Sequence, residues 1–286
     1  MNRRTATLGL AATLTLTSCG TGEAGAPPAQ PRHEATAQAR YEASVTVLEG
    51  GGHGPQICSA VADSLPPQCG GPDVVGWDWE AVRYESKAGV RWGDYRVVGT
   101  WDGASLTLTE PPGPPERKTP PAEDFSSPCP APTGGWRPVD PAKATQPALE
   151  RAIARAGTAE EFAGAWLDQD YLGERGADSP DANDPARLVL NLRFTGDLSE
   201  REAWIREVWG GALCVSGARR TEAELNSIQE RVQSGLGDAL ITASSSVPRN
   251  RVEVGVWLAT DEQRRAADER YGAGVVEFES VLQPVK

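Results

Sequence analysis

Histidine, methionine and long apolar runs are the scarcest features of this sequence. Its 286 residues include two histidines and one methionine, Met1. A serine or cysteine nucleophile needs a base within hydrogen-bonding distance, yet His33 lies in a polar stretch and His53 in a glycine-rich turn. The sequence also contains no G-x-S-x-G motif. We therefore expect no catalytic residue of the Ser–His or Cys–His type and predict a protein that is not an enzyme.

Basic residues are also in short supply. The sequence has 28 Lys and Arg against 40 Asp and Glu, a net charge of −12. Nucleic-acid binding depends on clustered Lys and Arg that neutralise phosphates, so we predict no nucleic-acid partner. The same balance argues against direct adhesion to anionic lipid. The acidic charge is explained more simply as a source of solubility.

No stretch of the sequence is apolar for the roughly 20 residues that a membrane-spanning helix needs. An uncharged run, Thr5 to Thr17, follows two arginines and leads into LTSC, which ends at Cys19. This arrangement is typical of a secretory signal, and its end resembles a bacterial lipobox. We predict a lipoprotein signal peptide over 1–18, a lipid (palmitate-type) anchor on Cys19, and a polar, proline-rich and glycine-rich tether over 19–40. The predicted location is the extracytoplasmic face of the cell membrane.

The number of cysteines supports this predicted location. With Cys19 assigned to lipid, four remain, and an even number outside the cytoplasm favours disulfides, with three pairings open. We favour Cys58–Cys69, because a Pro-Pro turn between them brings the ends together, and Cys129–Cys214 then follows by elimination. A zinc site is the rival interpretation, but no CxxC is present and histidines are few. We expect neither a metal nor another cofactor.

The first folded segment is predicted over 41–110 as a small antiparallel β-barrel domain of OB-like type. Short runs of β-branched and aromatic residues alternate with turn residues, and Asp102-Gly103 supplies a two-residue hairpin turn. The expected strands are 41–48, 79–84, 90–101 and 105–109. The proline-rich stretch 111–139 is predicted to be a linker.

The last segment, 140–286, is predicted to be an α+β domain. Each of four Ser or Thr residues stands three positions before Glu or Gln, as in a capping box, and a helical hairpin is expected first. The boxes are Thr158 with Glu161, Ser199 with Glu202, Thr221 with Glu224, and Thr260 with Gln263. The expected strands are 187–195, 213–215, 251–258 and 275–282. Leu188, Leu190 and Leu192 share one strand face, so we expect a sandwich whose sheet is mostly covered on one side.

Short motifs carry two resemblances. The strings GAWLD (164–168), LVLN (188–191) and ARRTEAELNSIQERV (218–232) resemble elements of secreted serine-protease pro-regions. The strings SLPPQCGGP (64–72) and WDW (77–79) resemble those of an uncharacterised actinobacterial lipoprotein family. The second resemblance implies an address and an architecture, but no activity.

Aromatic residues offer the remaining candidate for ligand binding. Trp77, Trp79, Trp92 and Trp101 form a candidate ligand surface on the first domain for a glycan or an envelope protein. Burial in the core is the competing explanation for all four.

Three functions stay open. The leading prediction is a lipid-anchored, non-enzymatic binding or scaffold module at the cell envelope. An envelope-polymer hydrolase with a carboxylate pair, drawn from Asp168, Asp170 and Asp197, is the first alternative. A solute-binding lipoprotein is the second. The acidic residues Asp178, Asp181 and Asp184 suggest calcium only weakly, because their spacing is not that of a calcium loop.

Overall fold

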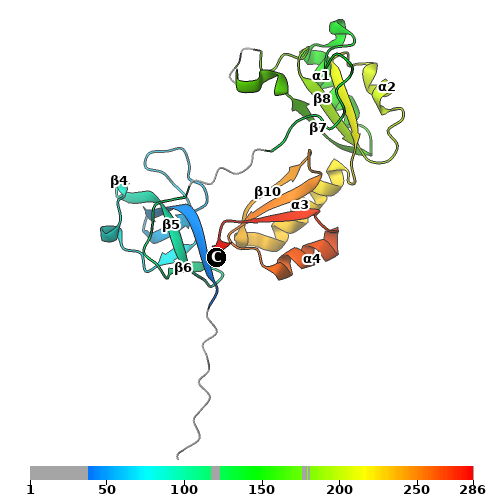
Figure 1. Cartoon of the computed structure of the whole chain (residues 1–286). Coiled ribbons are helices and arrows are strands. Elements are labelled where there is room, and N and C mark those ends of the chain that lie inside the picture. Colours follow the sequence, from blue (N-terminus) through cyan, green and yellow to red (C-terminus); the bar gives the residue numbers. More distant parts are fainter. Residues whose placement is uncertain (1–37, 117–122, 176–178, 180, 286) are drawn as a thin grey trace, which may run out of the picture. The chain divides into compact units, whose positions relative to one another are not determined.

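The computed structural model describes residues 38–116, 123–175, 179 and 181–285. From residue 39 onward the chain forms one unit of mixed α+β type (Figure 1). The predicted signal peptide, most of the tether and Cys19 lie outside the described residues. Within the described ranges, no helix is long and apolar enough to cross a membrane.

A seven-stranded sheet forms the first part of the unit. Its order is β13-β1-β2-β3-β6-β5-β4, and β1 also pairs with β5, so β1, β2, β3, β6 and β5 close a ring. The strands are β1 (Arg40–Gly50), β2 (His53–Cys58), β3 (Asp73–Val75), β4 (Glu85–Lys87), β5 (Val90–Trp101), β6 (Ser105–Leu108) and β13 (Gln283–Pro284). All pairings are antiparallel except β3–β6, which is parallel. Val45, Val47 and Val97 alternate inward and fill the ring.

Two local predictions for this part have opposite outcomes. A hairpin turn at Asp102-Gly103 is confirmed between β5 and β6, where the Asp102 carboxylate accepts hydrogen bonds from two following backbone N–H groups. The turn is longer than the two residues predicted, because Trp101 pairs with Leu106. The predicted strand over 79–84 is wrong. Asp78 accepts the N–H of Glu80 and begins a 3-10 turn, η1 (Trp79–Ala81), so local side-chain bonding replaces sheet pairing.

Two three-stranded sheets, rather than one, make up the second half of the unit. The first has α1 (Gln146–Ala156), β7 (Phe162–Asp168), β8 (Val189–Phe194), α2 (Arg201–Arg206) and β9 (Ala212–Gly217). The second has α3 (Glu222–Leu236), β10 (Leu240–Ser246), β11 (Arg251–Val256), α4 (Asp261–Tyr271) and β12 (Val276–Ser280). The 3-10 turns η2 (Pro141–Lys143), η3 (Asp170–Arg175) and η4 (Gly237–Ala239) lie outside these elements.

The two three-stranded sheets, each with its two helices, repeat one order of elements, α-β-β-α-β. In each, the first two strands are antiparallel and the last two are parallel. We call them repeat 1 (α1 to β9) and repeat 2 (α3 to β12). The inward residues of the middle strands correspond, and each set packs with the helices of its own repeat. These residues are Leu190, Leu192 and Phe194 in β8, and Val252, Val254 and Val256 in β11.

The helix-start predictions divide evenly. The capping boxes at Thr221 and Thr260 are both formed. Thr158 instead donates its hydroxyl to the carbonyl of Arg155 at the end of α1 and caps no helix. The predicted helical hairpin is therefore wrong, because the strand β7 follows α1 where a second helix was expected. Ser199 hydrogen-bonds with Asp197, and α2 begins after Glu200 with no side-chain cap.

The sheet of repeat 1 is covered on both faces, which corrects the expectation of one covered side. Helices α1 and α2 cover the face that carries Leu190. On the other face Val189 and Cys214 pack against Cys129 and Trp136 of the proline-rich segment. The predicted cysteine pairs are both confirmed, with Cα–Cα distances of 6.0 Å for Cys58–Cys69 and 5.7 Å for Cys129–Cys214.

Candidate functional site

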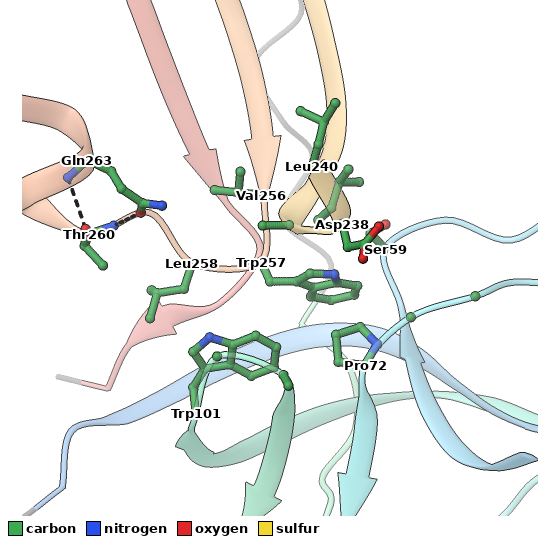
Figure 2. Close-up of a pocket in the computed structure, with 16 residues that line it drawn as sticks. Ser59, Pro72, Trp101, Asp238, Leu240, Val256, Trp257, Leu258, Thr260 and Gln263 are labelled. Carbon is green, nitrogen blue, oxygen red and sulfur yellow. Dashed lines mark hydrogen bonds between the residues drawn. The ribbon is translucent and has the colours of Figure 1, made fainter. Parts of the chain in front are cut away.

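A cleft of about 820 Å³ lies where the ring sheet meets repeat 2 (Figure 2). Trp101, at the end of β5, and Trp257, directly after β11, present their indole rings toward it from opposite sides. Pro72 and Leu258 add apolar surface beside the two rings. The cleft therefore has aromatic walls contributed by residues that are far apart in sequence. We call it the tryptophan cleft.

Strand pairing and packing hold Trp257 in this place. Its carbonyl accepts the N–H of Leu282 at 2.9 Å, just before β13 returns to pair with β1. The indole is 9% exposed and belongs to the apolar core of the ring. A Cβ at Gly71 would overlap the carbonyl of Ile57 and touch the Trp257 ring, so only glycine fits there.

Polar side chains lie at the edge of the tryptophan cleft. They are Ser59, Asp238, Thr260 and Gln263. The capping box fixes two of them, because the N–H of Thr260 donates to Oε1 of Gln263 at 2.8 Å and the N–H of Gln263 donates to Oγ1 of Thr260 at 3.1 Å. An apolar cleft with a few placed polar groups is the usual composition of a small-ligand site.

The structure separates the four tryptophans that the sequence grouped as a candidate ligand surface. Trp101 alone lines the tryptophan cleft. Trp79 is buried, and Trp77 packs against it with ring centroids 5.3 Å apart. Trp92 pairs with Leu48 and lies three residues before the buried Tyr95, on the other face of β5. Sequence reasoning missed Trp257, although an aromatic residue directly after the strand-like run RVEVGV was the available signal.

A carboxylate organises the buried aromatic cluster. Glu49 accepts a hydrogen bond from Trp79 Nε1 at 2.5 Å and another from Arg91 at 2.8 Å. Burial acts to raise the pKa of Glu49, but these bonds and the Arg91 charge outweigh it and hold the pKa below its ordinary value. Arg91 also lies over the Trp79 ring, 5.4 Å from its centroid. Glu49 thus satisfies Trp79 and Arg91, whereas Nε1 of the neighbouring Trp77 is buried without a hydrogen-bond partner among the described residues.

Two of the three proposed catalytic carboxylates come together. Asp168 and Asp170 line a cavity of about 440 Å³, whereas Asp197 lies in the turn before α2. Asp168 accepts hydrogen bonds from the backbone N–H and the hydroxyl of Ser127. The negative charge of Asp168, followed by burial and the charge of Asp124, raises the pKa of Asp170.

The other polar candidates are dispersed. Asp178 lies outside the described residues, and Asp181 forms an ion pair with Arg187. His53 Nδ1 is 2.8 Å from the carbonyl oxygen of Gly54 in an exposed position. In the part of the chain that the structure describes, no group of three or more His, Cys, Asp or Glu is placed to hold a metal ion.

Comparison with protein-family models and with curated proteins finds no match for this chain. The resemblances to protease pro-regions and to actinobacterial lipoproteins therefore stay predictions.

Proposed function

We propose that this protein is a lipid-anchored, extracytoplasmic binding module whose tryptophan cleft takes a segment of an envelope glycan. The observation that carries the proposal is the pair of facing indoles, Trp101 and Trp257, with polar side chains at the edge. Sugar rings present C–H groups that pack on aromatic faces, and their hydroxyls hydrogen-bond with polar groups. No step of this proposal requires catalysis.

The ring sheet supports the proposal as a rigid platform. We propose that it is a small barrel of OB-like type, since five strands close on one another and β1 pairs with β5 over ten successive residues. This places Trp101 at the end of a long strand that β1 pairs along most of its length. A side chain held on a strand is more precisely positioned than one on a loop.

Calorimetric titration with the tetramer of β-1,4-linked N-acetylglucosamine tests the cleft. We expect binding by the wild-type protein and affinity weakened at least about tenfold, or ~1.4 kcal/mol, by Trp101→Leu. Trp92→Leu is the matched control, because it removes the same side chain from the same strand outside the cleft. Absence of binding by the wild type, or equal losses in both variants, would overturn the proposal.

The anchor is tested separately by Cys19→Ser expressed in a bacterial host. We expect the wild type to fractionate with membranes and to gain the mass of a lipid at its mature N-terminus. The variant is expected to lose both properties. Membrane fractionation of the variant at the wild-type level would contradict the proposed anchor.

A hydrolase remains the second candidate, because one observation favours it. The raised pKa of Asp170 beside Asp168 is the pattern expected of a general acid with a carboxylate partner. Against the hydrolase, the backbone N–H and the hydroxyl of Ser127 already donate hydrogen bonds to the Asp168 carboxylate. Release of reducing ends from envelope polysaccharide that is abolished by Asp170→Asn, but not by Asp197→Asn, would favour the hydrolase over the binding module.

A further inference from the structure

A second large pocket lies where repeat 1 meets repeat 2, away from the tryptophan cleft. Its volume is about 760 Å³. Repeat 1 contributes β8 and the chain that leaves β9, and repeat 2 contributes the turn between β10 and β11 and the turn before β12. The lining residues that matter most are Arg193, Gly217, Arg219, Arg220, Arg249 and Gly272.

Four arginines and no acidic residue occur among the described residues that line this pocket. The positive charge of these lining residues is opposite in sign to the net charge of the whole chain, which is −12. Arg249 forms an ion pair with Glu253 at 2.7 Å, so its charge is largely balanced. The other three have no acidic partner of this kind in the described part of the chain.

Arg193 is a partly buried cation with neutral partners. Its guanidinium donates to the carbonyl of Gly217 at 3.1 and 2.8 Å, and to the carbonyls of Val247 at 3.1 Å and Pro248 at 2.7 Å. Burial lowers the pKa of Arg193. These carbonyls fix the side chain across the junction of the repeats, but they leave its positive charge without a counter-ion.

Backbone hydrogen bonds fix the positions of Arg219 and Arg220. Both N–H groups donate to Oδ1 of Asn250 at 3.0 Å, and Asn250 has a φ of 52°, a left-handed conformation that asparagine tolerates. The Arg220 guanidinium donates to the carbonyl of Tyr271 at 2.6 Å. The Arg219 side chain is exposed and makes no hydrogen bond or ion pair with the described residues. No described residue takes up its five donors, so they are available to a ligand.

The part of the pocket formed by the turn before β12 has little side-chain bulk. Gly272 and Gly274 have φ of 102° and 70°, which favours glycine at both positions. A Cβ at Gly272 would approach the Arg220 guanidinium to 3.2 Å. The glycines therefore keep space open beside a guanidinium, in a pocket whose volume exceeds that of one inorganic phosphate.

We propose that this pocket binds a small, soluble molecule that carries a phosphate group. The planar guanidinium groups of Arg219 and Arg220 match the oxygen spacing of a phosphate and donate two parallel hydrogen bonds. Arg193 adds the fixed charge that draws a dianion to the junction. This site is independent of the glycan proposal, because it shares no lining residue with the tryptophan cleft.

Titration of the purified protein with pyrophosphate in low salt tests the site. We expect saturable binding of one pyrophosphate and an affinity about tenfold weaker in Arg219→Ala, which corresponds to ~1.4 kcal/mol for a lost charge-assisted contact. Arg151→Ala is the matched control, because Arg151 is an exposed arginine of α1 that does not line the pocket. The control is expected to bind as the wild type does.

Four results would overturn the proposal. They are no saturable binding of pyrophosphate, equal weakening in Arg219→Ala and Arg151→Ala, binding of citrate as tight as that of pyrophosphate, and Arg219-dependent binding only to phosphatidylglycerol vesicles. The third result would assign the pocket to carboxylates, and the fourth to a membrane surface. Circular dichroism of both variants checks that each is folded.

Discussion

Glu49 is the residue on which the aromatic cluster of the ring depends most directly. It joins the indole of Trp79 and the guanidinium of Arg91 through two short hydrogen bonds. Replacing it with an isosteric amide keeps the shape but removes the charge. The buried indole then loses a charged acceptor, which is a stronger partner than a neutral one.

We expect Glu49→Gln to lower the free energy of unfolding at pH 7 by about 1 kcal/mol. This loss is smaller than that for a fully buried ion pair, because the site is partly solvated. Since the folded-state pKa of Glu49 lies below its ordinary value, the carboxylate stabilises the fold above that ordinary pKa. The contribution disappears as the pH falls through the folded pKa. Urea unfolding at pH 7 and at about pH 3 checks this. An equal difference between wild type and variant at both pH values would contradict it.

Asp170 and Asp197 have opposite electrostatic surroundings and form a matched pair for mutation. The neighbouring Asp168 raises the pKa of Asp170, whereas the backbone and hydroxyl of Ser199 lower that of Asp197. Ionised Asp170 therefore destabilises the fold at neutral pH, and ionised Asp197 stabilises it.

We expect Asp170→Asn to raise the melting temperature at pH 7 and Asp197→Asn to lower it. For Asp170 the gain shrinks as the pH falls through the raised folded pKa, because the wild-type carboxyl is then protonated too. For Asp197 the loss shrinks as the pH falls through the lowered folded pKa. Differential scanning calorimetry from pH 7 down to about pH 3 measures both trends, and shifts of the same sign at pH 7 would refute the assignment.

At the scale of elements, the helix caps separate real from apparent start signals. Thr221 and Glu224 form a reciprocal capping box at the start of α3. Thr158 and Glu161 have the same sequence pattern, but Thr158 lies at the end of α1. The element after Thr158 is the strand β7 and not a helix. The sequence spacing alone therefore does not tell a formed capping box from one that does not form.

Thr221→Ala is expected to lower the free energy of unfolding by about 1 kcal/mol, the usual cost of a lost N-cap. Thr158→Ala removes an exposed hydrogen bond and no cap, so we expect a change within about 0.5 kcal/mol. Urea unfolding of the two variants measures the contrast. A loss at Thr158 as large as that at Thr221 would show that the cap assignment is wrong.

The strands that sequence reasoning found and missed differ in the contacts that stabilise them. β5 and β8 carry apolar residues at alternating positions, so their own sequence specifies them. β10 contains three successive serines, and its pairing depends on tertiary contacts such as Ser245 Oγ donating to Gln229 of α3 at 2.9 Å. β7 includes Gly164, whose φ of 120° accompanies an irregular register with β8. Contacts of this kind are not visible in a local pattern.

The tryptophan cleft shows the same limit at the level of the site. Trp101 can be identified from sequence because β5 is locally obvious, but its partner Trp257 lies in the other half of the unit. The pairing of β13 with β1 and the packing of Trp257 into the core of the ring bring the two together. The basic pocket escapes sequence reasoning for a similar reason, because its arginines are spread from Arg193 to Arg249.

At the scale of the whole molecule, the two disulfides constrain the chain to different extents. Cys58–Cys69 closes a separation of 11 residues within the first part, whereas Cys129–Cys214 closes 85 residues and fastens the proline-rich segment to repeat 1. The chain-entropy model assigns about 2.8 kcal/mol to the shorter loop and about 4.6 kcal/mol to the longer one.

We expect the double variant Cys129→Ser/Cys214→Ser to lose more stability than Cys58→Ser/Cys69→Ser, by about 1.8 kcal/mol on the same model. Double variants are used so that no free thiol remains from the broken pair. Guanidinium unfolding without reductant measures the two differences. Equal losses would mean that native contacts, rather than loop length, determine the contribution of each bridge.

The long pairing of β1 has a mechanical consequence. The described chain enters the fold at β1, which is paired with β5 from Arg40 to Glu49 and with β2 and β13 on its other edge. Tension applied at the N-terminal end runs along the axis of this strand. The hydrogen bonds on its two edges lie across that axis, so they are loaded together in shear instead of opening one after another. A body held at its N-terminus and dragged by flow is therefore loaded along β1, and the pairings on both edges of that strand share the force.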